Sequence, residues 1–343
     1  MKQLLNTLYI TIPDVYLAAS GENIVIKQEE KILARYPFHN LEDIVLFSYL
    51  GMSPKLIQKC IEYGIGICYL TPTGRFIARI KGRTEGNILL RRKQYNLSDS
   101  EENSLSISQN IICAKIYNEK WTIERYIRQY ENRIDTGHLK QSSKYLTGLL
   151  DRVFETTSLE ELRGVEGIAQ STYFSCFDEM ILNQKEDFKF DVRSRRPPLN
   201  PVNALLSFVY SVLSNDVASA LESVGLDPYA GFMHSDRPGR ISLALDLVEE
   251  FRAPIADRFV LSLINLNQVK KEDFIYEESG AVTMKDDSRR KIIGLWQERK
   301  QEPLTHPFLN EKIKWGLVPF TQAILLSRYL RDDLDGYPAF MWK

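Results

Sequence analysis

From the start of the chain to about residue 95, short apolar runs alternate with polar positions and turn residues. Runs rich in β-branched and aromatic side chains are typical of strands. They are LYITI, VYLAAS, NIVIKQ, KILARYPF, DIVLF and GIGICYL, with turn residues such as SGEN (20–23) between them. Before the last run, PKLIQKCIEY (54–63) is predicted to be helical, because Leu56, Cys60 and Tyr63 share a face. Regular short strands with hairpin signals predict a small β-sandwich.

The pattern changes near Asn96, where a polar and acidic stretch, NLSDSEENS, follows the strand-like part. From Ser104 onward, apolar residues recur every three or four positions, which predicts helices almost throughout. A charged segment from Lys270 to Arg290 indicates either a small hairpin or a mobile insertion. We therefore predict an α+β protein of several domains. It comprises a β-rich N-terminal domain over 1–97, a linker over 98–104 and a larger all-α catalytic domain over 105–343.

Composition is ordinary for a soluble globular protein, with 44% apolar and 26% charged residues among 343. The net charge of −1 argues against a generic polycation but leaves room for local basic patches. The four cysteines lack CxxC spacing, which favours reduced thiols in a cytoplasmic protein over a zinc site. No secretory signal is convincing, and the apolar part of the longest uncharged run, 197–215, is too short for a membrane span. We expect no membrane partner.

Candidate chemistry is concentrated in GFMHSDRPGRISLALDLVEEFR (231–252). His234 lies in a loop rich in Gly and Pro, ahead of an amphipathic helix that carries Asp246, Glu249 and Glu250. Residues three apart on a helix share a face, so the carboxylates of Asp246 and Glu249 should project together. Acids beside an imidazole repel one another unless a cation or a proton relieves them, which indicates a divalent metal and phosphate chemistry. The alternative is a loop histidine that is only hydrogen-bonded or solvated.

A second candidate acid is Glu166, in ELRGVEGIAQSTYFSCFDE (161–179). It lies between two glycines, directly before a predicted helix, where a carboxylate is already favourable. The glycines favour a residue that another group must approach closely. The alternative is a first-turn acid that only complements the helix dipole.

Two basic segments are candidates for DNA contact. FKFDVRSRRPPLNPVN (188–203) contains Lys189, Arg193, Arg195 and Arg196 against one acid, Asp191. The segment 75–95 contains seven basic residues and one Glu: Arg75, Arg79, Lys81, Arg83, Arg91, Arg92 and Lys93. Guanidinium groups match phosphate oxygens, so both segments suit a nucleic-acid backbone. The alternatives are arginines paired with internal acids and an ordinary solvated surface.

Three motifs, GVEGIAQSTYF, RSRRPPLNPVNALLSFVYSVL and GFMH…GRISLALDLVEEFR, occur in the order found in a known family. Together they make the chain resemble, over essentially its whole length, the CRISPR-associated endonuclease/integrase family, Cas1. The segment DLVEEFRAPIADRFVLSLIN and the tail YPAFMWK look most like the type I-C branch. Many relatives outside that branch have proline directly after the second acid, where this chain has Glu250, so the role of this third carboxylate is left open.

The resemblance implies a metal triad, which falls residue by residue on Glu166, His234 and Glu249. Asp246 matches an acid that contributes to the site in some relatives, as a further ligand or as a group that orients the histidine. It also implies an N-terminal β-sandwich that takes part in dimerisation and DNA contact, followed by an α-helical catalytic domain. The implied partners are a second copy of the chain, the small protein Cas2 and double-stranded DNA.

The implied reaction is phosphodiester transesterification, in which a 3′-hydroxyl of a short foreign DNA fragment attacks a phosphate at the edge of a CRISPR repeat. Carboxylate ligands suit Mg²⁺ or Mn²⁺, and an imidazole shifts the preference toward Mn²⁺. Arg193, Arg195, Arg196, Arg91, Arg92 and Lys93 are the candidates for gripping phosphates. The alternatives are a metal-dependent structure-specific DNA nuclease and a non-catalytic DNA-binding scaffold.

Overall fold

The structure is a computed structural model that describes the chain except residues 1–6, 13, 48–49, 72–75, 81 and 83–87. Its contacts divide the chain into two compact units, 1–85 with 284–301 and 86–283 with 302–343. This division differs from the predicted boundary at residue 97. The predicted linker, 98–104, holds only a short turn between two helices of the second unit, α2 (Ile88–Ser98) and α3 (Glu101–Tyr130). The Ser100 side chain accepts a hydrogen bond from the Asn103 amide, and this N-cap starts α3 within the polar stretch.

The first unit contains two sheets that share one hydrophobic core. A four-stranded sheet has the order β1-β5-β6-β7, and a three-stranded antiparallel sheet has the order β2-β3-β4. Leu17 and Ile24 from the smaller sheet and Ile44 and Ile67 from the larger belong to the same buried cluster. The strands are β1 (Thr7–Ile10), β2 (Tyr16–Ser20), β3 (Asn23–Gln28), β4 (Lys31–Pro37), β5 (Asp43–Phe47), β6 (Gly66–Leu70) and β7 (Phe76–Ile80).

The predicted β-sandwich is confirmed only in part, because the larger sheet is mixed. β1 and β5 are parallel, as are β5 and β6, whereas β6 and β7 are antiparallel. Parallel neighbours require a crossover connection, and α1 (Pro54–Glu62) provides the one between β5 and β6. The Ser53 side chain caps α1 by accepting a hydrogen bond from the Leu56 amide at 3.2 Å, and Pro54 occupies its first turn.

A late segment returns to the first unit. The helix α9 (Asp286–Gln301) is hydrogen-bonded there through Arg290 Nε, which donates to the carbonyl of Thr11 at 3.3 Å. Gln297 Nε2 donates to the carbonyl of Thr7 at 3.5 Å. Just before α9, β8 (Phe274–Tyr276) pairs with β9 (Val282–Met284), so the hairpin alternative for 270–290 is confirmed.

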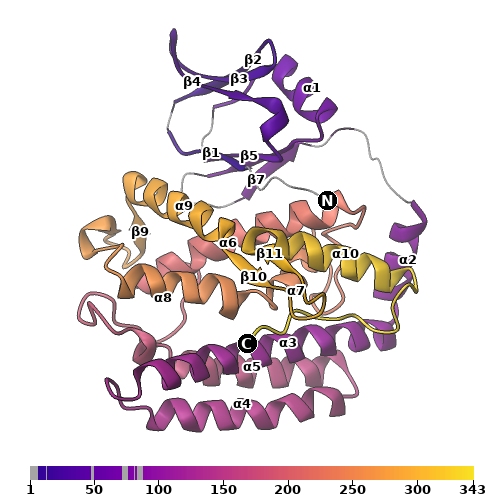
Figure 1. The fold of residues 1–343 in the computed structure, drawn as a ribbon, viewed down its shortest axis with the longest axis vertical. Coiled ribbons are helices and arrows are strands. Elements are labelled where there is room, and N and C mark those ends of the chain that lie inside the picture. Colours follow the sequence, from indigo (N-terminus) through magenta and orange to yellow (C-terminus); the bar gives the residue numbers. More distant parts are fainter. Residues whose placement is uncertain (1–6, 13, 48–49, 72–75, 81, 83–87) are drawn as a thin grey trace. The chain divides into compact units, whose positions relative to one another are not determined.

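The second unit is a helical assembly. Its helices α3, α4 (Gly137–Glu155) and α5 (Leu159–Ser175) run side by side (Figure 1), and α6 (Pro201–Ser223) packs against α7 (Ser242–Val248) and α10 (Val318–Leu330). A π-helix (Arg252–Asp257) leads into α8 (Arg258–Asn265). A two-stranded antiparallel sheet of β10 (Pro303–Thr305) and β11 (Lys312–Lys314) precedes α10.

The helix α6 extends well beyond the apolar run seen in the sequence. The Asn200 side chain caps it by accepting a hydrogen bond from the Asn203 amide at 2.8 Å, and Pro201 begins it. Among the described helices it alone is long and apolar enough for a membrane span, yet 67% of its most apolar window is buried inside the protein. Burial of this kind is typical of the core helix of a soluble protein.

Candidate active site

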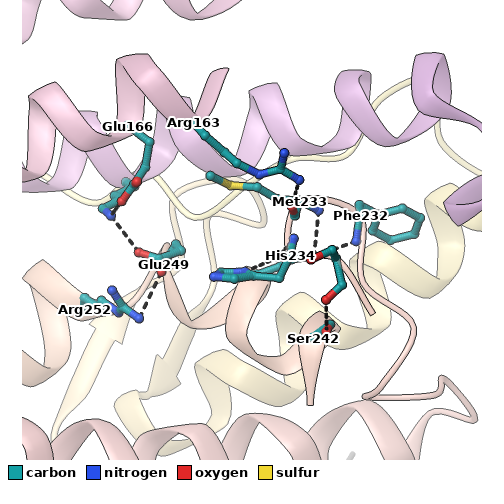
Figure 2. A network of polar contacts seen from close by, with 11 residues as sticks. Arg163, Glu166, Phe232, Met233, His234, Ser242, Glu249 and Arg252 are labelled. Carbon is teal, nitrogen blue, oxygen red and sulfur yellow. Dashed lines mark hydrogen bonds and ion pairs between the residues drawn. The ribbon is translucent and has the colours of Figure 1, made fainter. Parts of the chain in front are cut away.

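Four parts of the second unit supply the candidate side chains. Lys115 comes from α3, Glu166 from α5, His234 from the loop before α7, and Glu249 from the residue after α7. Figure 2 shows the side chain of Glu249 with Glu166 above it, Arg252 below it and His234 on its other side. Glu166 and His234 both keep partial exposure, 18% for the Glu166 side chain and 22% for that of His234, whereas Glu249 keeps 4%. A substrate can therefore reach the site from the side of Glu166 and His234.

The prediction that Glu166 precedes a helix is wrong, because it lies in the middle of α5. The helix begins seven residues earlier, at Leu159, where the Ser158 side chain accepts a hydrogen bond from the Glu161 amide. Two acids in the first turn complement the helix dipole there, so Glu166 is not needed for that role. The helical register instead directs its carboxylate toward α3.

The buried Lys115 joins the two acids that are far apart in the sequence. Its ammonium contacts a carboxylate oxygen of Glu166 and lies 2.8 Å from Oε2 of Glu249. Burial opposes the charge of Lys115, but Glu249 and Glu166 raise its pKa above the usual value, so it stays protonated. Sequence reasoning missed this residue. The only signal was a lysine within an otherwise apolar stretch of α3, IICAKI.

Glu249 has a second cationic neighbour, Arg252, whose Nη2 lies 3.0 Å from its Oε1. Burial alone would raise the pKa of the Glu249 carboxyl, but Arg252 and Lys115 lower it to about 2. The imidazole of His234 also lies close enough to lower that pKa. Glu249 is therefore a buried carboxylate that remains ionised across the physiological pH range.

His234 is oriented by Asp246 and not by Glu249. Nδ1 of His234 lies 2.6 Å from Oδ1 of Asp246, which also accepts the His234 backbone amide at 3.0 Å. Oδ2 of Asp246 accepts the amides of Phe232 at 2.6 Å and Met233 at 3.1 Å. We assign the Nδ1 proton to the bond with this carboxylate, which leaves the Nε2 lone pair to face a ligand.

The prediction that Asp246 and Glu249 project together is wrong. Asp246 is fully buried, and its two oxygens are engaged by four donors from the loop, so it positions the histidine rather than facing the same cation. Glu249 lies beyond the end of α7, which stops at Val248, and it turns toward α3 and α5. The helical spacing of apolar residues continues in the sequence beyond α7. In the structure, however, the α-helix ends at Val248 and is followed by a turn and then by the π-helix.

Gly231 allows the loop to approach α7 this closely. A Cβ at this position would lie 2.7 Å from Cβ of Ser242 and 2.9 Å from Oδ2 of Asp246. The loop is also held by Arg163 of α5, whose Nη2 donates to the carbonyl of Met233 at 2.6 Å (Figure 2). The Ser242 hydroxyl donates to the carbonyl of Ser235 at 3.2 Å. These contacts fix the position of the imidazole relative to α5.

The donors present fit a hard divalent cation. Glu166 and Glu249 already share one positive charge, the ammonium of Lys115, and carboxylate oxygens with an imidazole nitrogen are ligands for Mg²⁺ or Mn²⁺. In the described part of the chain, however, no three His, Cys, Asp or Glu side chains are grouped as a metal-ligand set. The ammonium of Lys115 lies between the carboxylates of Glu166 and Glu249. A metal ligand set therefore stays a prediction.

Glu250, whose role the sequence left open, faces away from the site. It accepts hydrogen bonds from the Tyr337 hydroxyl at 2.7 Å, the Phe340 amide at 2.7 Å and Gln322 Nε2 at 3.1 Å. Burial raises its pKa to about 7, although these donors act in the opposite direction. Glu250 therefore anchors the C-terminal tail, and Asn118 helps by donating to the carbonyls of Glu250 and Phe340.

The predicted phosphate-gripping residues differ in their surroundings. Arg193 is engaged inside the protein, because it donates to Asn203 Oδ1 at 2.8 Å and Ser207 Oγ at 3.1 Å. Arg195 and Arg196 are exposed, and Nη2 of Arg195 lies 3.4 Å from Oε1 of Gln170 on α5. Gln170 follows Glu166 by one helical turn, which brings Arg195 to the same face of α5.

In the second basic segment, Arg92 is exposed and Arg91 is partly buried. Lys93 forms an ion pair with Asp332 at 3.0 Å, so its charge is partly compensated. Arg75, Lys81 and Arg83 lie outside the described residues.

The sequence profile of the family described as CRISPR associated protein Cas1 matches residues 8–298. A CRISPR-associated endonuclease Cas1 from Chlorobaculum tepidum is 46% identical over 343 residues, which cover 100% of both chains. The chain belongs to the Cas1 family. The predicted family, the predicted CRISPR endonuclease/integrase function and the predicted enzyme class are thereby confirmed.

Two solved structures share the fold of this Cas1 family member. A casposase bound to integration product has a TM-score of 0.84 at 23% identity, over 99% of this chain and 95% of the casposase chain. A Cas6-RT-Cas1–Cas2 complex has a TM-score of 0.81 at 23% identity, over 100% of this chain and 36% of the longer chain. The mixed α/β architecture of the chain is therefore that of Cas1 folds.

Proposed function

We propose that this Cas1 family member is a metal-dependent integrase that joins short foreign double-stranded DNA to a CRISPR repeat. The proposed ligand set for Mg²⁺ or Mn²⁺ is Glu166, His234 and Glu249. The observation that carries the proposal is the meeting of Glu166 and Glu249 on one positive charge, Lys115, with the oriented imidazole of His234 beside Glu249. Asp246 positions that imidazole.

A divalent cation bound there supplies Lewis acidity at the phosphate and stabilises the negative charge of the transition state. The residues of the chain provide the rest. Asp246 accepts the hydrogen bond from protonated Nδ1 of His234, which leaves the Nε2 lone pair for a ligand. Arg252 keeps Glu249 ionised. The chain needs no covalent nucleophile, because the attacking group is the 3′-hydroxyl of the incoming DNA.

Arg195 and Arg196 are the proposed phosphate contacts next to the site. Their exposure and the position of Arg195 beside Gln170 put positive charge on the face of α5 that carries Glu166. Arg91, Arg92 and Lys93 are a second proposed contact region, with Lys93 competing against its ion pair to Asp332. Arg193 is not proposed as a contact, since its Nη1 and Nη2 donate inside the protein and its Nε is buried.

The proposal extends to the setting in which the reaction takes place. We place the protein in the cytoplasm, as a homodimer that assembles with Cas2, in the type I-C branch of the family. The support is the full-length similarity to Cas1 endonucleases and the shared fold with a chain of the Cas6-RT-Cas1–Cas2 complex. The tail YPAFMWK, which Glu250 anchors, carries part of the likeness to that branch.

The test is a strand-transfer assay with purified chain and Cas2, supercoiled array DNA, and a fragment ending in either a 3′-hydroxyl or a dideoxynucleotide. Integration requires the hydroxyl and yields joined DNA, whereas hydrolysis alone yields cut DNA with either fragment. Glu166→Ala and His234→Ala should each lower joining by at least about 100-fold, since a metal ligand is removed. Asp236→Ala, an exposed acid of the same loop, is the matched control. A folded Glu166→Ala variant with wild-type joining would refute the assignment.

A further inference from the structure

Lys115 occupies the position that the proposed metal site requires. Its side chain is 1% exposed, and its ammonium contacts both Glu166 and Glu249. A metal ion cannot occupy the same place between Glu166 and Glu249 as the ammonium of Lys115, because the two cations would repel each other strongly at contact distance in a buried site. A metal that takes both carboxylates as ligands must therefore displace the ammonium, whereas Arg252 can keep its separate contact with the other oxygen of Glu249.

The same helix offers the displaced ammonium another partner. Glu119 follows Lys115 by four residues on α3, so the two side chains lie on the same face. Glu119 is 3% exposed, and its Oε2 is buried without a hydrogen-bond partner in the described structure. Such an oxygen is costly to leave unpaired, which makes it a ready acceptor for a lysine that moves by rotating its own side chain.

We propose that Lys115 is a built-in counter-cation, which neutralises Glu166 and Glu249 until the metal binds and then transfers its ammonium to Glu119. The inference rests on the metal site proposed above. It accounts for the close approach of the carboxylates of Glu166 and Glu249, which would otherwise repel each other. Burial raises the pKa of Glu119 to about 8, so below that pH its carboxyl releases one proton to solvent as it accepts the ammonium. No other covalent bond changes in this exchange.

The exchange predicts opposite effects for its two residues on metal affinity. Removing the ammonium with Lys115→Met eliminates the competitor, so the dissociation constant for Mn²⁺ should fall by about tenfold or more. Replacing the acceptor carboxylate by a neutral amide with Glu119→Gln leaves the displaced ammonium without a counter-charge, so the dissociation constant should rise by a factor of about three to ten. In the double variant the Glu119 substitution should have little further effect, because no ammonium remains to be received.

The experiment is a titration of the full-length protein with Mn²⁺ at one fixed pH, followed by the electron paramagnetic resonance signal of free Mn²⁺. It uses the wild type, both single variants, the double variant and Lys144→Met, an exposed lysine on α4, as the matched control. Circular dichroism checks that each variant is folded. Glu166→Ala is included because its failure to bind Mn²⁺ assigns the signal to this site.

The outcomes separate the exchange from the metal site itself. If Glu166→Ala weakens Mn²⁺ binding but Lys115→Met does not tighten it, the exchange is overturned and the proposed function stands. If Glu119→Gln weakens binding equally with and without Lys115, its charge acts directly on the metal and the exchange is again overturned. If no variant binds Mn²⁺, both proposals fail. Should Lys115→Met not fold, the Glu119→Gln titration alone decides, since unchanged affinity contradicts the exchange.

Discussion

At the scale of single residues, Asp246 is the group on which the geometry of His234 depends. Replacing it by Asn removes the anion beside Nδ1 and puts an N–H donor among four donors that converge on the carboxylate. Asp246→Asn should lower strand transfer by roughly 10- to 100-fold. It should also lower the free energy of unfolding by about 1–3 kcal/mol. Joining assays and urea denaturation measure the two effects. Asp236→Asn should change neither, and a fully active, fully stable Asp246→Asn protein would contradict the role.

The arginines of 188–203 should separate into structural and DNA-contacting residues. Arg193→Ala should lower the free energy of unfolding by about 1–3 kcal/mol, because Ser207 would lose the guanidinium donor and Asn203 would keep only the Ser194 amide. Arg195→Ala and Arg196→Ala should leave stability unchanged but weaken DNA binding. Each should reduce the logarithmic salt slope by about 0.9 for every phosphate that the arginine had neutralised. Fluorescence anisotropy of labelled DNA over a range of salt concentrations measures this. A larger change of slope for Arg193→Ala than for Arg195→Ala would reverse the assignment.

The sequence singled out Glu166 by its flanking glycines, His234 by its loop rich in Gly and Pro, and Glu249 by its place on a predicted helix, and only the family resemblance joined the three in one predicted ligand set. It could not separate Asp246 from Glu249, because that depends on where α7 ends. It also missed Lys115, since a lysine inside a helical pattern is normally a solvated residue. Only the packing of α3 against α5 shows that this lysine lies between two acids.

At the scale of elements, replacing the glycines around the site by alanine should change the free energy of unfolding in opposite directions at different positions. Gly164 and Gly167 lie in exposed turns of α5, and a Cβ at either would meet nothing within 4 Å. Gly164→Ala and Gly167→Ala should each raise the free energy of unfolding by about 0.5–1 kcal/mol, since Ala is the better helix former. Gly231→Ala should lower it and impair joining, because its Cβ would collide with Ser242 and Asp246. Denaturant unfolding of the three variants tests this. Destabilisation by Gly167→Ala would contradict the prediction and show that the position requires glycine.

Element predictions succeeded where the signal is local. The antiparallel strands β2, β3 and β4 and the helix α1 follow the apolar pattern and the turn and cap residues of the sequence. The pairing of β1 with β5 and of β5 with β6 is non-local, and nothing in alternation distinguishes a parallel partner from an antiparallel one. The start of α5 was misplaced because glycines were given more weight than the Ser158 cap and the acids that follow it.

At the scale of the whole molecule, the return of α9 to the first unit could not be predicted from the sequence. Its hydrogen bonds join Arg290 and Gln297 to backbone carbonyls of the first strand region, and backbone acceptors carry no sequence signature. The anchoring of the C-terminal tail by Glu250 was equally hidden, because its partners Gln322, Tyr337 and Phe340 are brought together only by the packed fold.

The buried acids of the second unit give the molecule an unusual dependence on pH. Burial raises the pKa of Glu119 to about 8, of Glu250 to about 7 and of Asp257 to about 6. In the unfolded chain these carboxyls titrate near pH 4, so the folded state holds more protons between about pH 4 and pH 8. The free energy of unfolding should therefore fall as pH rises through that window, by up to about 1.4 kcal/mol per pH unit for each group.

The contribution of Glu249 to the free energy of unfolding depends on pH in the opposite direction. Its pKa is lowered to about 2, so its stabilising charge is lost only as the pH falls toward that value. The second unit should thus be most stable well on the acidic side of neutrality, near about pH 4. Urea denaturation at several pH values, followed by tryptophan fluorescence, measures the trend, since three of the four tryptophans, Trp121, Trp315 and Trp342, belong to the second unit. Glu119→Gln should flatten it, whereas Glu102→Gln, at an exposed position of the same helix, should not. Stability that rises from pH 5 to pH 8 would show that the folded protein keeps these acids ionised at little cost.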